Sequence, residues 1–128
     1  MDEPSEADDL IARQIVDSAF AVHSSLGPGL LESVYEQCLT YELQTRNLRV
    51  ARQIQSPIQY GDTIIDGGLR LDMMVNESVV VEIKAVENIL PLHKAQLLTY
   101  LKLARRRLGL LINFNVPLIK DGIRRVLG

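Results

Sequence analysis

The chain has 128 residues, of which 47% are hydrophobic and 23% are charged. This length fits a single domain with its own core, and the composition excludes a disordered or fibrous protein. Cys38 is the only cysteine, which excludes an intrachain disulfide, and no apolar run approaches the roughly 18 residues of a membrane span. The acidic N-terminus lacks the basic-then-apolar order of a signal peptide. Together these features predict a cytoplasmic protein without membrane contact.

The net charge of −2 conceals an asymmetry along the chain. Residues 1–93 carry a formal charge of −9, whereas residues 94–128 carry +7. The acidic total gives no support for nucleic-acid binding through bulk charge, but a basic tail is compatible with such binding. A basic run in this tail has two interpretations, phosphate contacts or the solvated end of a helix. Its members are Lys102, Arg105, Arg106 and Arg107.

Two helices are predicted in the first part of the chain. Residues 1–7 are expected to be a flexible acidic terminus, and residues 8–128 a single domain. From residue 8 to about residue 25, apolar side chains recur at helical spacing, and Asp8 or Asp9 is expected to cap this helix. The Gly-Pro-Gly segment 27–29 ends it, and a second helix follows to about Arg46.

The middle of the chain changes to short extended runs. A hairpin turn is predicted at residues 61–62 and an irregular break at 66–68, followed by an alternating strand at 69–75. Residues 76–78 connect this strand to the next, which is predicted at 79–85.

The last part of the chain returns to a helix that begins at Pro91. The continuous apolar run 108–114 predicts a strand that is buried on both faces, and residues 119–127 predict either a short strand or a helical turn. The element order is therefore roughly α-α-β-β-β-β-α-β. This order predicts a mixed α/β fold in which helices flank a central sheet.

The sequence places two acidic residues and a lysine on neighbouring strands. Glu82 and Lys84 are two residues apart and therefore share a face of their strand. A three-residue connection at 76–78 puts Asp72 opposite Glu82 on that face. Such charges on an apolar hairpin are costly unless they are compensated, and a divalent cation with hard oxygen ligands compensates them. The alternative is a surface strand on which Lys84 forms an ordinary ion pair with either carboxylate.

Three motifs resemble a known family. Asp72 followed by Glu82-Ile-Lys84 resembles the motif of the PD-(D/E)XK nuclease superfamily, although Leu71 stands where the proline of that motif is usual. Gln96-Leu-Leu-Thr-Tyr100 resembles the Gln-xxx-Tyr element of RecB-like nucleases. Gly29-Leu-Leu-Glu32-Ser-Val-Tyr35 resembles the motif that names the GxxExxY protein family, which is grouped with these nucleases. The resemblance covers residues 18–126 and implies a restriction-endonuclease-like core.

The resemblance also implies roles for individual residues. Glu32, Asp72 and Glu82, with the carbonyl of Ile83, would be the ligands of one or two Mg²⁺ or Mn²⁺ ions. Lys84 would orient the attacking water and offset phosphate charge. Without the resemblance, Glu32 is an ordinary first-turn residue that favours the helix dipole. Catalytic roles are accordingly expected for Lys84, Glu82, Asp72 and Gln96, and nucleic-acid contacts for Arg70, Tyr100, Arg105, Arg106 and Arg107.

These residues predict a metal-dependent nuclease that hydrolyses phosphodiester bonds of DNA or RNA. One alternative is a catalytically silent module of the same fold that binds nucleic acid or a protein. A third interpretation is an assembly subunit whose carboxylates only stabilise a dimer. Because one small domain contacts a limited stretch of duplex, a homodimer or a larger complex is expected. His93, near the start of the third helix, is interpreted as an exposed or capping residue, with a contact to substrate as the alternative.

Overall fold

The computed structural model describes residues 3–128 and has the predicted mixed α/β architecture. Its helices and strands are α1 (Glu6–Leu26), α2 (Glu32–Thr45), β1 (Val50–Tyr60), β2 (Thr63–Val75), β3 (Val79–Lys84), α3 (Pro91–Ala104), β4 (Leu108–Asn113), the 3₁₀ helix η1 (Ile119–Gly122) and β5 (Ile123–Leu127). The strands form one sheet in the order β1-β2-β3-β4-β5. Only β3 and β4 pair in parallel. The connection between them contains α3, which returns the chain to the end of the sheet at which β3 begins.

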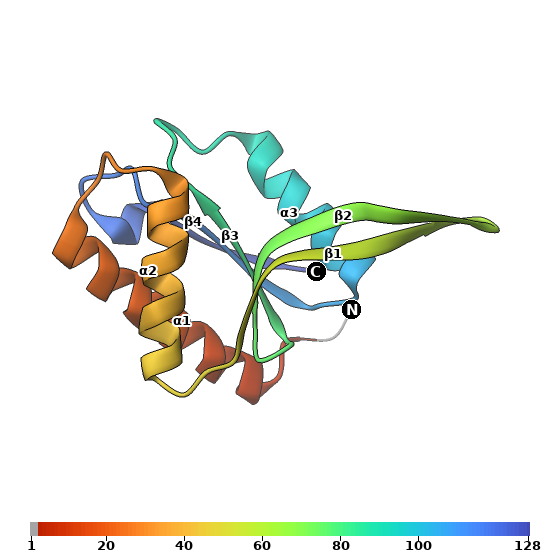
Figure 1. The fold of residues 1–128 in the computed structure, drawn as a ribbon, viewed down its shortest axis with the longest axis horizontal. Coiled ribbons are helices and arrows are strands. Elements are labelled where there is room, and N and C mark those ends of the chain that lie inside the picture. Colours follow the sequence, from red (N-terminus) through yellow and green to blue (C-terminus); the bar gives the residue numbers. More distant parts are fainter. Residues whose placement is uncertain (1–2) are drawn as a thin grey trace.

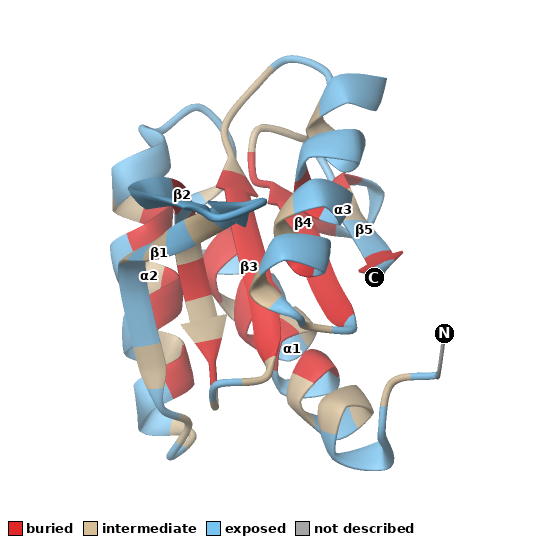
Figure 2. Cartoon of the chain, turned by 90° about the vertical axis from the view of Figure 1, so that its right-hand side faces the viewer, coloured by how far each residue is buried: buried red, intermediate tan, exposed pale blue. Residues whose placement is uncertain are grey.

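Helices cover both faces of the sheet, so the molecule has two cores (Figures 1 and 2). One core lies between the sheet and the pair α1 and α2, and the other lies between the sheet and α3. Successive residues of β3 alternate between them: Val79, Val81 and Ile83 belong to the first core, and Val80 belongs to the second. All six residues of β4 are buried, as the continuous apolar run predicted. Glu82 therefore lies in the only part of the fold where a strand is covered on both faces by helices.

The predicted element order agrees approximately with the structure and is wrong in one detail. Three strands, rather than four, lie between α2 and α3, because β2 continues through the predicted break at 66–68. Gly67 adopts φ +64°, and the register shifts between Ser56 and Ile58 on the facing strand, so the two glycines form a bulge instead of a break. The tail contains both predicted alternatives in succession, a 3₁₀ turn and then the edge strand β5.

The first helix begins two residues earlier than predicted. Ser5 is its N-cap, and the Ser5 Oγ accepts a 3.0 Å hydrogen bond from the backbone N–H of Asp8, so neither Asp8 nor Asp9 caps the helix. Met1 and Asp2, which belong to the predicted flexible terminus, lie outside the described residues. None of the helices between residues 3 and 128 combines the length and apolarity that crossing a membrane requires.

The hairpin of β1 and β2 bends sharply away from the rest of the sheet (Figure 1). The strands pair regularly on either side of the bend, at Arg52 with Met73 and at Ile54 with Leu71, and the bend lies at the positions between them, Gln53 and Asp72. Gln53 has φ +49°, which is unusual for a residue other than glycine. Side chains change faces there, because Leu71 belongs to the α3 core and Met73 to the core beneath α1 and α2. We call the projecting part, residues 54–71, the arm; β2 leaves β3 at its base.

Candidate active site

The predicted acidic pair lies at the fork where β2 and β3 separate. The ladder between these strands ends with Met73 opposite Val81, so Asp72 and Glu82 are the next positions outward. The backbone N–H of Asp72 donates to the Glu82 Oε2, and the backbone N–H of Ile83 donates to the Asp72 Oδ2, both at 2.9 Å. Each carboxylate therefore accepts a hydrogen bond from a backbone N–H of the opposite strand, as a backbone carbonyl does within the ladder. The opposed placement that the three-residue connection predicted is present, with residues 76–78 as the turn.

Burial and mutual repulsion make this pair difficult to ionise. Glu82 is only 5% exposed, and its burial, followed by the nearby charge of Asp72, raises the pKa of Glu82 to about 7. Burial also raises the pKa of Asp72, against the opposing effects of the Ile83 N–H and the charge of Lys84. A bound cation would relieve the same repulsion.

Other predicted residues approach this fork from neighbouring elements. Partial burial and the charge of Asp72 raise the pKa of Glu32 in the first turn of α2, while Lys84 and Arg70 act on it in the opposite direction. Burial, then Glu82 and Asp72, raise the pKa of Tyr100 on α3, and a hydrogen bond from Gln96 opposes this shift. The structure thus gathers Glu32, Arg70, Asp72, Glu82, Lys84, Gln96 and Tyr100 around one fork.

The turn before α2 is built by the aromatic residue of the predicted motif. The Tyr35 hydroxyl donates to the carbonyl of Gly27 at 2.6 Å and accepts from the N–H of Leu30 at 3.1 Å. Its ring is fully buried and stacks on Phe114, with centroids 4.6 Å apart. Gly29, with φ +99°, allows the chain to turn between these contacts. The motif therefore fixes where α2 begins, and with it the position of Glu32.

We expect Tyr35→Phe to destabilise the protein by about 1 kcal/mol, because the buried ring is retained but two part-buried hydrogen bonds, to the backbone of Gly27 and Leu30, lose the hydroxyl. Urea unfolding followed by circular dichroism would measure the change. Tyr41→Phe is the matched control, because Tyr41 lies on the same helix and is 67% exposed. Equal stabilities of the two variants would contradict this role for the hydroxyl.

Asn113 is a positioning residue that the sequence analysis missed. It is 1% exposed at the end of β4, where its Oδ1 accepts from the N–H of Val86 at 3.0 Å and its Nδ2 donates to the Val86 carbonyl at 2.9 Å. The backbone of Phe114 also donates to the carbonyl of Lys84. These bonds hold the segment that follows Lys84. An asparagine that ends a wholly apolar run was the available signal.

The arginine run does not reach the fork. Arg106 donates to the carbonyl of Glu77 in the turn before β3, and Arg107 donates to the carbonyl of Glu3. Arg105 ends α3 in a left-handed conformation. All three therefore lie at the opposite end of β3 from Lys84, because β4 starts beside the start of β3. The capping interpretation of His93 is confirmed, since its Nδ1 accepts from the N–H of Leu90 at 3.0 Å.

The fork suits a hard divalent cation by its donor chemistry. Asp72 and Glu82 each use one oxygen on a backbone N–H, and their second oxygens have no hydrogen-bond donor within residues 3–128. Mg²⁺ needs only one or two carboxylates because it retains several waters. In the described part of the chain, no three His, Cys, Asp or Glu side chains lie close enough together to form a complete metal cage. A cation here would therefore depend on two principal carboxylates and on water.

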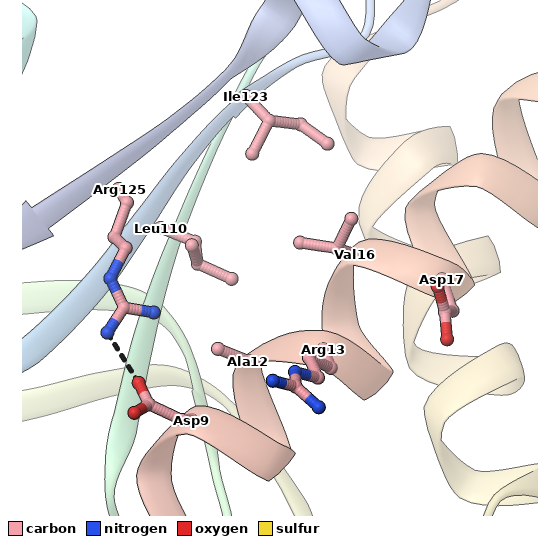
Figure 3. Close-up of a pocket in the computed structure, with 8 residues that line it drawn as sticks. All are labelled: Asp9, Ala12, Arg13, Val16, Asp17, Leu110, Ile123 and Arg125. Atoms are coloured by element: carbon pink, nitrogen blue, oxygen red, sulfur yellow. Dashed lines mark hydrogen bonds and ion pairs between the residues drawn. The ribbon is translucent and has the colours of Figure 1, made fainter. Parts of the chain in front are cut away.

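The cavity in Figure 3 is a separate feature. It has a volume of about 590 Å³ and lies between α1 and strands β4 and β5, on the sheet face opposite α3. Its walls include apolar residues such as Val16 and Leu110, and Asp9 in its rim forms an ion pair with Arg125. It contains none of the predicted site residues.

Comparison with known families agrees with the geometry of the fork. A family model described as the PD-(D/E)XK nuclease superfamily matches residues 9–126. The chain belongs to this superfamily. The predicted recognition and fold class are confirmed at the superfamily level, whereas membership of the GxxExxY family stays a prediction. Neither the comparison with curated proteins nor that with solved structures found a match.

Proposed function

We propose that this protein is a Mg²⁺- or Mn²⁺-dependent nuclease that hydrolyses phosphodiester bonds of DNA or RNA. The observation that carries the proposal is the fork itself. The Glu82 carboxylate accepts from the N–H of Asp72 and the Asp72 carboxylate accepts from the N–H of Ile83, with Lys84 two residues beyond Glu82. In a chain of the PD-(D/E)XK superfamily, this arrangement is best explained by phosphodiester hydrolysis.

The acidic residues would hold the metal. Asp72 and Glu82 would be its principal ligands, with the Ile83 carbonyl from β3. Glu32 on α2 lies too far from the pair to complete a cage of three carboxylates and would act through water bound to the ion. When bound, the ion would polarise the scissile phosphate and lower the pKa of a bound water. The third carboxylate, Glu32, makes a second ion compatible with the site.

Lys84 and the α3 pair would act on the substrate. The Lys84 ammonium would orient the water that attacks phosphorus and would offset charge as the bond to the leaving oxygen breaks. Gln96 and Tyr100, four residues apart, share a helix face and would orient Lys84, the water or the nucleic-acid backbone. Arg70 beside them would contact a phosphate. The run Arg105–Arg107 would contact the backbone farther away, since Arg106 bonds the turn before β3 and Val79, the first residue of β3, precedes Glu82 by about 10 Å of extended strand.

Cleavage of a labelled panel of single- and double-stranded DNA and RNA tests the proposal. Each reaction would be run with Mg²⁺, with Mn²⁺ and with chelator, and Asp72→Asn is the control variant. We expect cleavage only with metal, and its loss in the variant. Metal-bound, folded protein that binds nucleic acid without cutting would instead favour the silent-module alternative. Activity that persists in Asp72→Asn would contradict the assigned site.

We also propose that the chain forms a homodimer through the arm. The arm favours it, because its tip exposes Tyr60 by 81% and Ile64 by 63%. The outer part of the arm, residues 54–69, contains Asp62 and Asp66 and no lysine or arginine, which disfavours nucleic acid as the partner of the tip; Arg70 lies at the base of the arm. Sedimentation equilibrium would test self-association, and replacing Tyr60 and Ile64 by serine should shift the mass toward the monomer.

A further inference from the structure

Glu36 is a buried carboxylate for which the mechanism above has no use. It lies on α2 one turn after Glu32 and is 8% exposed. Its Oε2 accepts from the Arg52 Nε at 3.1 Å and from the Arg52 Nη2 at 3.0 Å, and its Oε1 accepts from the Gln53 Nε2 at 2.7 Å. We call these three residues the Glu36 clamp. A buried acid with three hydrogen bonds to two consecutive residues of one strand is a built feature rather than a chance surface pair.

The clamp requires the bend in β1. Consecutive residues of a regular strand point to opposite faces, so Arg52 and Gln53 could not both reach one carboxylate from an unbent strand. They do so because Gln53 adopts φ +49°. That conformation carries a steric cost for a residue with a Cβ, and the hydrogen bond from its side chain to Glu36 offsets the cost.

The bend at Gln53 lies directly across the hairpin from the candidate metal ligand Asp72. Asp72 lies in the facing position on β2, between the regular pairs of Arg52 with Met73 and Ile54 with Leu71. Because β1 and β2 bend together there, β2 leaves β3, and the two carboxylates can reach backbone N–H groups across the fork.

We propose that Glu36 is a positioning residue, which sets the carboxylates of Asp72 and Glu82 by holding Gln53 in its left-handed conformation. The consequence for cleavage rests on the proposed nuclease function, but the positioning itself does not. Two other roles for Glu36 are distinguishable from this one: a general anchor of α2 on the sheet, and a negative charge that acts on the fork through space.

Amide hydrogen exchange by NMR, on the full chain without metal or nucleic acid, tests the proposal. The amides of Asp72 and Ile83 are the reporters, because they donate to Glu82 and Asp72. We expect Glu36→Gln to speed exchange at both at least tenfold, with less than twofold change at Leu111 in β4. Glu42→Gln is the matched control on α2, since the Glu42 side chain has no hydrogen bond within residues 3–128.

A glycine at position 53 distinguishes an effect of Glu36 through the backbone conformation of residue 53 from an effect of its charge through space. Glycine adopts positive φ without a steric cost, so Gln53→Gly in the Glu36→Gln background should return exchange to within threefold of the wild type. Failure of this rescue would favour the through-space charge and overturn the proposal. Unchanged exchange in Glu36→Gln, or equal acceleration at Leu111, would overturn it as well.

Cleavage assays then extend the result. If the wild type cuts nucleic acid, Glu36→Gln should lower kcat/KM at least tenfold and glycine at position 53 should restore it. If the wild type does not cut, the exchange result still stands, and only the proposed function fails.

Discussion

Lys84→Ala is expected to reduce the cleavage rate by about 10²–10³-fold while leaving metal binding intact. Removing one group that stabilises developing charge in a water-excluded site typically costs that much. Lys84 is not among the proposed ligands, and its structural contact is made through its backbone carbonyl, which accepts from the N–H of Phe114. The variant should therefore fold and bind Mn²⁺ as the wild type does. Single-turnover cleavage and calorimetric Mn²⁺ titration would measure the two effects separately.

Lys94→Ala is the control, because Lys94 is an exposed lysine on α3 and its replacement makes the same change in net charge. It should cleave within about twofold of the wild type, as expected for a surface charge outside the site. A Lys84→Ala protein as active as Lys94→Ala would show that the lysine of the motif is no part of the chemistry. Loss of Mn²⁺ binding together with cleavage would mean that Lys84 maintains the site rather than acting in it.

The hairpin that carries the acidic pair was predictable because two simple constraints determine it. Side chains alternate with a period of two along each strand, and a three-residue turn fixes which positions oppose. The buried β4 followed for a similar reason, since a continuous apolar run suits only a strand with cover on both faces. These constraints act locally and can be recognised from residue type and spacing.

The bend at the base of the arm was not predictable in the same way. Its key residue is a glutamine with positive φ, a conformation that residue type signals only for glycine, asparagine or aspartate. The side chain of this glutamine donates to Glu36, which is 17 residues earlier in the chain, so the partner cannot be recognised from local sequence. The Gly67-Gly68 pair gave the converse error, because two glycines permit a bulge and a break equally.

The position of the arginine run depended on topology. Its distance from the fork follows from the parallel pairing of β3 and β4, which returns the chain to the start of β3 before β4 begins. Residue pattern places Lys102 to Arg107 at the end of a helix, and this interpretation agrees with the structure. It does not by itself say which end of the sheet that helix end approaches.

Glu82→Gln is expected to stabilise the metal-free protein at alkaline pH relative to the wild type. Because the pKa of Glu82 is about 7 in the fold, against 4.5 for the ordinary group, the fold favours its protonated form. The stability that this preference contributes is complete below pH 4.5 and is lost as the pH rises through 7. At 1.36 kcal/mol per pKa unit, the loss is about 3 kcal/mol. Glutamine stays neutral and avoids this loss, and its carbonyl oxygen can still accept from the Asp72 N–H.

Urea unfolding in chelator between pH 4.5 and pH 8 would measure the free energy of unfolding of both proteins. The advantage of the variant should grow with pH and level off above 7, whereas Glu87→Gln at an exposed position should show no such trend. Saturating Mn²⁺ at pH 8 should then reverse the order, because a ligand that binds only the folded wild type stabilises it alone. If the stability advantage of the variant does not change with pH, the pKa of Glu82 is not raised in the fold. If the advantage depends on pH but Mn²⁺ leaves it unchanged, Glu82 is a buried acid that does not bind the metal. The main reason to regard the fork as a nuclease centre would then be lost.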